Sequence, residues 1–410
     1  MINNKFKLGP ELIFTITIVL FFVLMLVVEN INGRFQTNDF RVMYDAADSF
    51  VHGKAVYGVP FGLSTGYYKY SPFTLLLFVP YTIFSFKTAS ILHFFIIALS
   101  AIASIILIER IISKLFFKNN NQRLLMYFLI FISVALHIIK DIHLGNTNTI
   151  LIFFLILSLY LTLNNRLILS ALFLTLAIFT KPYFAISILP FLLYKKYKTI
   201  LFSIIFGITF LLITIIFAGL SNSIHLHVQW ILSMVEHSIM LESSYTFFYL
   251  MNNYLGANIP ANYSYHLFML IGLLSYLCFW LCKRIQKENG TFIVGQSLTI
   301  FFAFLVAIIP NILITDNEHF IFTLPLITFM ILYLRESKNY WMIALFIIAI
   351  LMYGGNSTDI VGKELTLKIK YWGLLGIGNL LIIIMSLLSY YLIRKNREFE
   401  SKATLKDVAS

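Results

Sequence analysis

Several side chains that could do chemistry lie close together in TNDFRVMYDAADSFVHGKAVYG, residues 37–58. They include Asp39, Arg41, Asp45, Asp48 and His52. Carboxylates, histidines and cationic groups are the side chains that proteins use to move protons and to balance negative charge. Structural roles would also account for them, because Asp39 suits the first turn of a helix, and Arg41 and Asp45 are spaced as an i, i+4 pair.

Polar motifs recur at three further points, each beside an apolar segment. They are KDIHLGNTN at residues 140–148, FTKPY at 179–183 and TDNEHF at 315–320. Polar groups at membrane depth are costly and are usually functional. Together with the first stretch, these motifs predict one shared cavity that contains charged, amide and histidine side chains.

The elements that must position these motifs are membrane helices. The chain of 410 residues is 60% hydrophobic and 12% charged. Apolar runs of about twenty residues recur along it, and such a run matches the hydrocarbon core of a bilayer, which is roughly 30 Å thick. We therefore expect an all-α, polytopic membrane protein. The net charge of +12 does not indicate nucleic-acid binding, because the basic residues cluster between apolar runs, as topology signals do.

About twelve transmembrane helices are predicted. They cover residues 11–28, 88–108, 124–140, 147–163, 167–180, 182–194, 199–218, 265–282, 291–312, 320–334, 340–355 and 371–393. The apolar segment at 71–86 is ambiguous, because it is short and contains Pro80. If it crossed the membrane, the basic segment at 109–123 would face outward, in conflict with every later basic segment. We therefore interpret it as an interfacial or re-entrant helix.

This arrangement puts both termini in the cytoplasm, as the positive-inside rule prefers, and the long loops at 29–87, 219–264 and 355–370 outside. Residues 1–393 are expected to form a single integral-membrane domain. Residues 394–410 are expected to form a charged cytoplasmic tail that is disordered. The chemistry must then lie in the outer loops and at the outer ends of the helices.

An amphipathic helix in the outer interface is predicted for residues 40–51. The apolar residues recur at helical spacing, at Phe40, Met43, Tyr44, Ala47, Phe50 and Val51. Thr37 or Asn38 could cap its start, and Gly53 could end it. Asp39 then lies in its first turn.

The order of the motifs resembles the polyprenol-phosphate-sugar-dependent GT-C glycosyltransferases, specifically glycosyltransferase family 87, which includes polyprenol-phosphate-mannose-dependent mannosyltransferases. The resemblance covers about residues 35–330 and rests on NDFRVMYDAADSFVHGKAVYG, YKYSPF, LGNTN, FTKPY and NEHF. Ser71 stands where the family usually has the first of two prolines, and Asn146 where it usually has glutamine.

The resemblance implies a polyprenyl-phosphate sugar donor, an acceptor hydroxyl and an inverting displacement. Asp39 matches the family's general base, which takes the proton of the acceptor hydroxyl. The leaving phosphate needs positive charge and hydrogen-bond donors. The candidates for contact with the phosphate are Lys181, His319, Arg41 and Lys69, and those for contact with the sugar or acceptor are Asn146, Asn148, Asp45 and Tyr70. No metal ion and no cofactor is expected.

Simpler roles stay open for several candidates. Lys181 could snorkel at the interface, Lys69 could make a cation–π contact with a neighbouring tyrosine, and Asn148 could belong to a tight turn. For the whole chain the main alternative is a transporter or flippase of lipid-linked sugars. An envelope scaffold and a GT-C enzyme that glycosylates protein are two others.

Charge concentrated at the outer helix ends, without a visible internal repeat, favours an enzyme over a transporter. We expect a membrane glycosyltransferase, best described as a mannosyltransferase, in the bacterial inner membrane with its site facing outside. Its partners would be the lipid-linked donor, a lipid or glycan acceptor and membrane lipids, and not nucleic acid.

Overall fold

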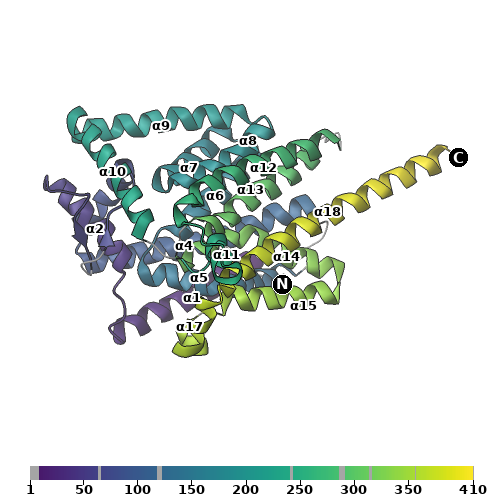
Figure 1. The fold of residues 1–410 in the computed structure, drawn as a ribbon, viewed down its shortest axis with the longest axis horizontal. Helices are drawn as coiled ribbons and strands as arrows, with labels where there is room; N and C mark the ends of the chain where they lie inside the picture. The colour runs from purple at the N-terminus through teal and green to yellow at the C-terminus, as the bar shows by residue number, and fades with distance from the viewer. Residues whose placement is uncertain are drawn as a thin grey trace, which may run out of the picture.

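The structure is a computed structural model that describes residues 9–62, 66–117, 122–240, 243–285, 291–313, 316–355 and 357–409. These residues are mainly helical (Figure 1). The elements in chain order are α1 (Pro10–Ile31), α2 (Asn38–Val51), β1 (Pro60–Phe61), β2 (Gly66–Tyr67), α3 (Pro72–Phe78), η1 (Val79–Ile83), α4 (Phe86–Phe116), α5 (Arg123–Leu144), α6 (Asn148–Leu163), α7 (Leu167–Thr180), η2 (Pro182–Ser187), α8 (Ile188–Leu193), α9 (Tyr197–Ala218), α10 (Leu220–Met240), α11 (Phe247–Leu255), η3 (Ala261–Tyr263), α12 (Ser264–Ile285), α13 (Thr291–Ile312), η4 (Asn317–Thr323), α14 (Leu324–Ser337), α15 (Tyr340–Gly354), α16 (Thr358–Val361), α17 (Lys363–Tyr371) and α18 (Leu374–Ala409).

Eight helices in the described part of the chain are long and apolar enough to cross a membrane. The predicted segments at 147–163, 167–180, 182–194 and 340–355 form shorter apolar helices instead. The prediction of an all-α polytopic membrane protein is confirmed, while the count of twelve crossings stays a prediction.

The ambiguous segment at 71–86 forms the short helices α3 and η1, separate from the long helix α4. Ser71 caps α3 by accepting a hydrogen bond from the Thr74 backbone N–H at 3.2 Å, and Ser85 caps α4 in the same way through Thr88. Capping side chains satisfy backbone donors that have no partner within the helix, so they fix where each helix begins. The interfacial position of this segment stays a prediction.

The expectation of a disordered tail is wrong for residues 394–409, because α18 continues through them to Ala409. These residues contain no proline or glycine and are rich in Lys, Arg, Glu and Ala, which favour helix. In Figure 1 this part of α18 projects from one end of the bundle, and α2 lies near the opposite end.

The helix α2 packs through a small apolar core of its own, beside the main core of the bundle. Phe40, Met43 and Ala47 are buried there, as the amphipathic pattern predicts, whereas Val51 is exposed. The Phe40 ring stacks on His93 of α4, with 4.4 Å between ring centroids. This packing holds the first turn of α2 against the bundle and thereby sets the position of Asp39.

Candidate active site

The Asp39 carboxylate reaches across to the turn between α5 and α6. Its Oδ2 atom accepts a hydrogen bond of 2.7 Å from Asn146 Nδ2. Thr37 occupies the N-cap position of α2, but its hydroxyl donates to Ser90 at 3.1 Å instead of capping the helix. Asp39 therefore does more than favour the helix dipole, because its side chain joins two distant parts of the chain.

The α5–α6 turn presents Asn146 in a fixed orientation. Asn146 Oδ1 accepts from the Thr147 backbone N–H at 2.7 Å and from the Tyr70 hydroxyl at 3.4 Å, so the Nδ2 group faces Asp39. Gly145 adopts a φ of +68°, and a Cβ atom there would lie 2.7 Å from Phe40 Cβ. Glycine thus allows both the turn and the close approach of α2.

Lys181 lies between α7 and Pro182 and is 7% exposed. Its Nζ atom is 2.5 Å from Asn148 Oδ1 and 2.8 Å from His319 Nε2. An ammonium group has only donors, so His319 Nε2 must accept, and His319 Nδ1 then donates to the Asp316 carbonyl at 3.2 Å. Lys181 therefore fixes the neutral, Nδ1-protonated form of His319.

Asp141 of α5 also belongs to this arrangement, although the sequence analysis did not predict it as a site residue. It is fully buried, and its two oxygens accept from Asn148 Nδ2 at 2.9 Å and from the Thr149 backbone N–H at 2.8 Å. A buried carboxylate must be hydrogen-bonded to be tolerated. Asp141 therefore orients Asn148, which in turn orients Lys181.

We call the set formed by these side chains the central polar cluster. It consists of Asp39, Tyr70, Asp141, Asn146, Asn148, Lys181 and His319. The Tyr70 ring centroid lies 6.0 Å from Lys181 Nζ, and so connects the Asp39 side of the cluster with the Lys181 side. Asp39, Asp141, Asn148 and His319 lie on α2, α5, α6 and η4, and Lys181 directly follows α7, so the four polar motifs meet in one cluster.

The surroundings of Asp39 raise its pKa above that of an ordinary aspartate. Burial raises the pKa of Asp39, and Asp316 raises it further, while Lys69, Lys181 and the Asn146 hydrogen bond lower it. Burial and Lys69 lower the pKa of Lys181. The charge of Lys69 therefore acts on both Asp39 and Lys181. The backbone of Lys69 is held by Trp230 of α10, whose indole N–H donates to the Lys69 carbonyl at 3.1 Å.

Three of the predicted site residues, Arg41, Asp45 and Lys69, are not members of the cluster, although the charge of Lys69 acts on Asp39 and Lys181. The Arg41 guanidinium lies over the Phe86 ring at 3.8 Å, and the Asp45 carboxylate accepts from the Gly62 backbone N–H. Residues two and six positions after Asp39 point to other sides of a helix with 3.6 residues per turn. Asp48 Oδ1 lies 3.4 Å from His52 Nδ1 at the end of α2. The i, i+4 pair of Arg41 with Asp45, which the spacing allowed, is not among the ion pairs of the described residues.

Asp316, Glu318 and His319 form a group that the sequence analysis did not single out as metal ligands. One potential ligand atom of each lies within 4.8 Å of the others. Lysines already contact two of them, because Lys140 Nζ is 3.5 Å from Glu318 Oε2 and Lys181 Nζ is 2.8 Å from His319 Nε2. A metal ion would compete with these two lysines for the same side chains, so we do not infer a metal site from Asp316, Glu318 and His319. Thr315, in the same motif, lies outside the described residues.

The chain matches a known protein family over a range that includes part of this site. A family model described as Glycosyltransferase family 87 matches residues 68–310, which is more than half of the chain. The apolar helices and this match together identify a membrane glycosyltransferase. The chain belongs to glycosyltransferase family 87. None of the curated proteins compared with the chain matches it.

Proposed function

We propose that this protein transfers a sugar from a polyprenyl-phosphate donor to a hydroxyl group of a lipid or glycan, with inversion at the anomeric carbon. Mannose is the first sugar to test. The observation that supports this proposal best is the Asp39 carboxylate, which accepts a hydrogen bond from Asn146 in the same polar cluster that holds Lys181 and His319. Membership of the family supports the general class of reaction.

Asp39 acts as the general base in this proposal. The acceptor oxygen attacks the anomeric carbon from the face opposite the phosphate, and its proton passes to Asp39. The bond between the anomeric carbon and the phosphate oxygen breaks, and the phosphate leaves with the electron pair. A raised pKa suits a base of this kind, because general bases work best when their pKa lies near the working pH.

Lys181 and Lys69 stabilise the leaving phosphate, and His319 holds Lys181 in place, because its Nε2 atom accepts from Lys181 Nζ while its Nδ1 atom donates to the Asp316 carbonyl. An ammonium group has three N–H donors, and among the described residues Asn148 and His319 accept two from Lys181, which leaves one for a phosphate oxygen. Positive charge that is already in place costs no reorganisation as negative charge develops. Asn146, Asn148 and Tyr70 can bind hydroxyl groups of the sugar or the acceptor.

The donor reaches this site from the membrane. We place the protein in the bacterial inner membrane with the cluster facing the periplasm, because this orientation puts most Lys and Arg residues on the cytoplasmic side. The lipid chain of the donor then stays in the bilayer while its phosphate meets Lys181.

The test is sugar transfer by the purified chain from a panel of synthetic polyprenyl-phosphate sugars to extracted envelope lipids and glycans. Asp39→Asn keeps the size of the side chain and removes the base, so we expect transfer to fall by about 10²–10⁴-fold. Asp48→Asn is the matched control, because Asp48 lies on the same helix but is half-exposed and pairs with His52. Equal activity in wild type and Asp39→Asn would reject Asp39 as the base.

The same panel separates the enzyme from the transporter alternative. A transporter would bind a lipid-linked sugar, and move it across a reconstituted bilayer, without breaking its phosphate bond. Release of free polyprenyl phosphate by the wild type identifies a transferase. Saturable donor binding without such release, in every acceptor mixture, would favour the transporter.

A further inference from the structure

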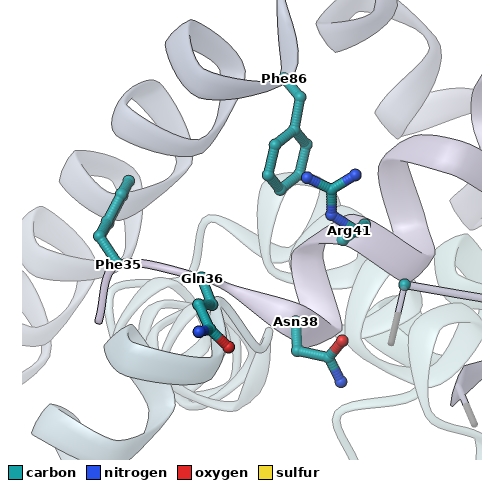
Figure 2. Close-up of a pocket in the computed structure, with 6 residues that line it drawn as sticks. Phe35, Gln36, Asn38, Arg41 and Phe86 are labelled. Atoms are coloured by element: carbon teal, nitrogen blue, oxygen red, sulfur yellow. The ribbon is translucent and has the colours of Figure 1, made fainter. Parts of the chain in front are cut away.

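A basic groove lies beside the start of α2, where Figure 2 shows Phe35, Arg41 and Phe86 around it. It consists of two adjoining cavities of about 380 and 330 Å³ that share Phe35, Arg41 and Phe86. The other lining residues are Gln36, Asn38 and Gly62 in the larger cavity and Asn30, Gly33, Lys87 and Ser90 in the smaller one. Both volumes fall within the range of about 300–1,000 Å³ that is usual for small-molecule sites. We call this site the Arg41 groove.

The Arg41 groove lies where two apolar helices end. Asn30 and Gly33 belong to the end of α1 and the residues just after it, and Lys87 and Ser90 belong to the first turns of α4. Both α1 and α4 are long and apolar enough to cross a membrane. A groove at their ends lies at the level where the hydrocarbon core gives way to lipid headgroups.

The chemistry of the groove favours an anion. Stacking of the Arg41 guanidinium on Phe86, seen in Figure 2, holds it in one plane while its N–H edges stay able to donate. A guanidinium held in this way suits paired hydrogen bonds to two phosphate oxygens. Lys87 adds a second positive charge, and the described lining residues include no carboxylate. Asp45, one turn further along α2, is bound to the Gly62 N–H and is near enough for the Arg41 charge to lower its pKa, so it offsets part of that charge.

We propose that the Arg41 groove binds the phosphate headgroup of an anionic membrane lipid, at a site separate from the central polar cluster. Inorganic phosphate shares the same chemistry. The position at the ends of two apolar helices and the flanking rings of Phe35 and Phe86 favour a lipid. A bound headgroup would join the ends of α1 and α4 to α2, which carries Asp39 on its other side. The proposal does not depend on the sugar-transfer activity.

The experiment measures binding to the purified full chain in a neutral detergent by native mass spectrometry. The probes are dihexanoyl phosphatidylglycerol, dihexanoyl phosphatidylcholine and inorganic phosphate. We expect saturable binding of phosphatidylglycerol, weakened about tenfold by Arg41→Gln and by Lys87→Gln, which each remove one charge-assisted contact. Arg41→Lys keeps the charge but loses the paired geometry, so its affinity should lie between those of the wild type and Arg41→Gln.

Lys54→Gln is the matched control, because Lys54 is an exposed lysine after α2 that does not line the groove. Its affinity for phosphatidylglycerol should equal that of the wild type. Circular dichroism and gel filtration establish that each variant is folded. The proposal is overturned if Arg41→Gln binds phosphatidylglycerol as well as the wild type does, or if the wild type does not bind it. Equal affinity for inorganic phosphate or phosphatidylcholine would overturn the anionic-lipid assignment.

Discussion

The Asn146 side-chain amide donates a 2.7 Å hydrogen bond to the Asp39 carboxylate, across 107 residues of sequence. Asn146 cannot rotate freely, because its oxygen is held by the Thr147 backbone N–H. The turn that carries Asn146 packs against the first turn of α2 so closely that a Cβ atom on Gly145 would lie 2.7 Å from Phe40 Cβ. The position of the proposed base therefore depends on the backbone of a turn in another part of the chain.

The first prediction concerns this contact. Gly145→Ala places a Cβ atom 2.7 Å from Phe40 Cβ, in a backbone conformation that costs a non-glycine residue about 1–2 kcal/mol. We expect α2 to move away from the turn and sugar transfer to fall by about 10²-fold, since a displacement of about 1 Å can cost this much. Steady-state kinetics with the donor that the wild type uses will measure the loss.

Gly53→Ala separates the close approach from backbone strain. Gly53 has a φ of +67°, nearly the same as that of Gly145, but a Cβ atom there would meet nothing within 4 Å. Gly53→Ala should therefore lower stability about as much through strain alone, while its activity stays near the wild-type value. Equal losses of activity in the two variants would contradict our account of the turn.

The second prediction is a pH dependence that follows from the raised pKa of Asp39. A general base must be deprotonated, so kcat/KM falls as the pH drops through the pKa of the base. Burial raises this pKa, so the acid limb should lie above the value of about 3.9 that is typical of an exposed aspartate. The Asn146 hydrogen bond lowers the pKa, so Asn146→Ala should move the limb to still higher pH.

A series of kcat/KM measurements between pH 4 and about 9 tests both statements. Lys69 and Lys181 lower the pKa of Asp39 and Asp316 raises it, so these residues stay unchanged in the experiment. Asp48→Asn should leave the profile as it is in the wild type. An acid limb near pH 4 in the wild type, or a limb that moves to lower pH in Asn146→Ala, would contradict the assignment.

The helix α2 could be predicted from the sequence because its signals are local. Apolar residues recur at helical spacing, and Gly53 follows its last turn. The direction of the Asp39 side chain could not be predicted in this way, because Asn146 is a distant partner. Pairing of Arg41 with Asp45 was one possibility that the spacing left open, but a pair of this kind contributes only about 0.2–0.5 kcal/mol. A stacked aromatic ring from another helix contributes about 0.5–2 kcal/mol and competes successfully.

Asp141 could have been predicted from the sequence as a buried, hydrogen-bonded acid. It lies in KDIHLGNTN near the end of an apolar helix, and a buried acid there must find donors. The sequence therefore contained a signal for Asp141, although not its partners. Asn148 and Thr149 become its neighbours because the turn at Gly145 folds α6 back beside α5.

The third prediction is that Asp141 acts through Asn148 and Lys181. In Asp141→Asn an amide NH₂ group must face either Asn148 Nδ2 or the Thr149 N–H, so two donors meet in a buried site. We expect a loss of about 1–3 kcal/mol in stability and a lower kcat, because Lys181 is no longer held in place. Thermal unfolding in detergent and steady-state kinetics measure the two effects.

A double-mutant cycle tests whether these residues act as one unit. Asn148→Ala alone should also lower kcat, and adding Asp141→Asn to it should cost little more, since the contact between them is already lost. Glu109→Gln is a comparison variant, because Glu109 is also fully buried but bonds Ser113 and Tyr127 instead of this cluster. If the losses in kcat from Asp141→Asn and Asn148→Ala were additive, Asp141 would not act through Asn148.

The fourth prediction concerns orientation in the membrane and tests the shorter helices at the same time. The predicted crossings at 88–108, 124–140, 147–163, 167–180 and 182–194 separate Lys54 from Lys195, and both lysines are exposed. An odd number of crossings puts them on opposite sides, with Lys54 outside by the positive-inside rule. In a chain whose two cysteines, Cys278 and Cys282, are replaced by serine, an impermeant maleimide should label Lys54→Cys in intact spheroplasts and Lys195→Cys only after permeabilisation. Labelling of both in intact spheroplasts would mean that one of the segments does not cross, and labelling of Lys195→Cys alone would reverse the proposed orientation.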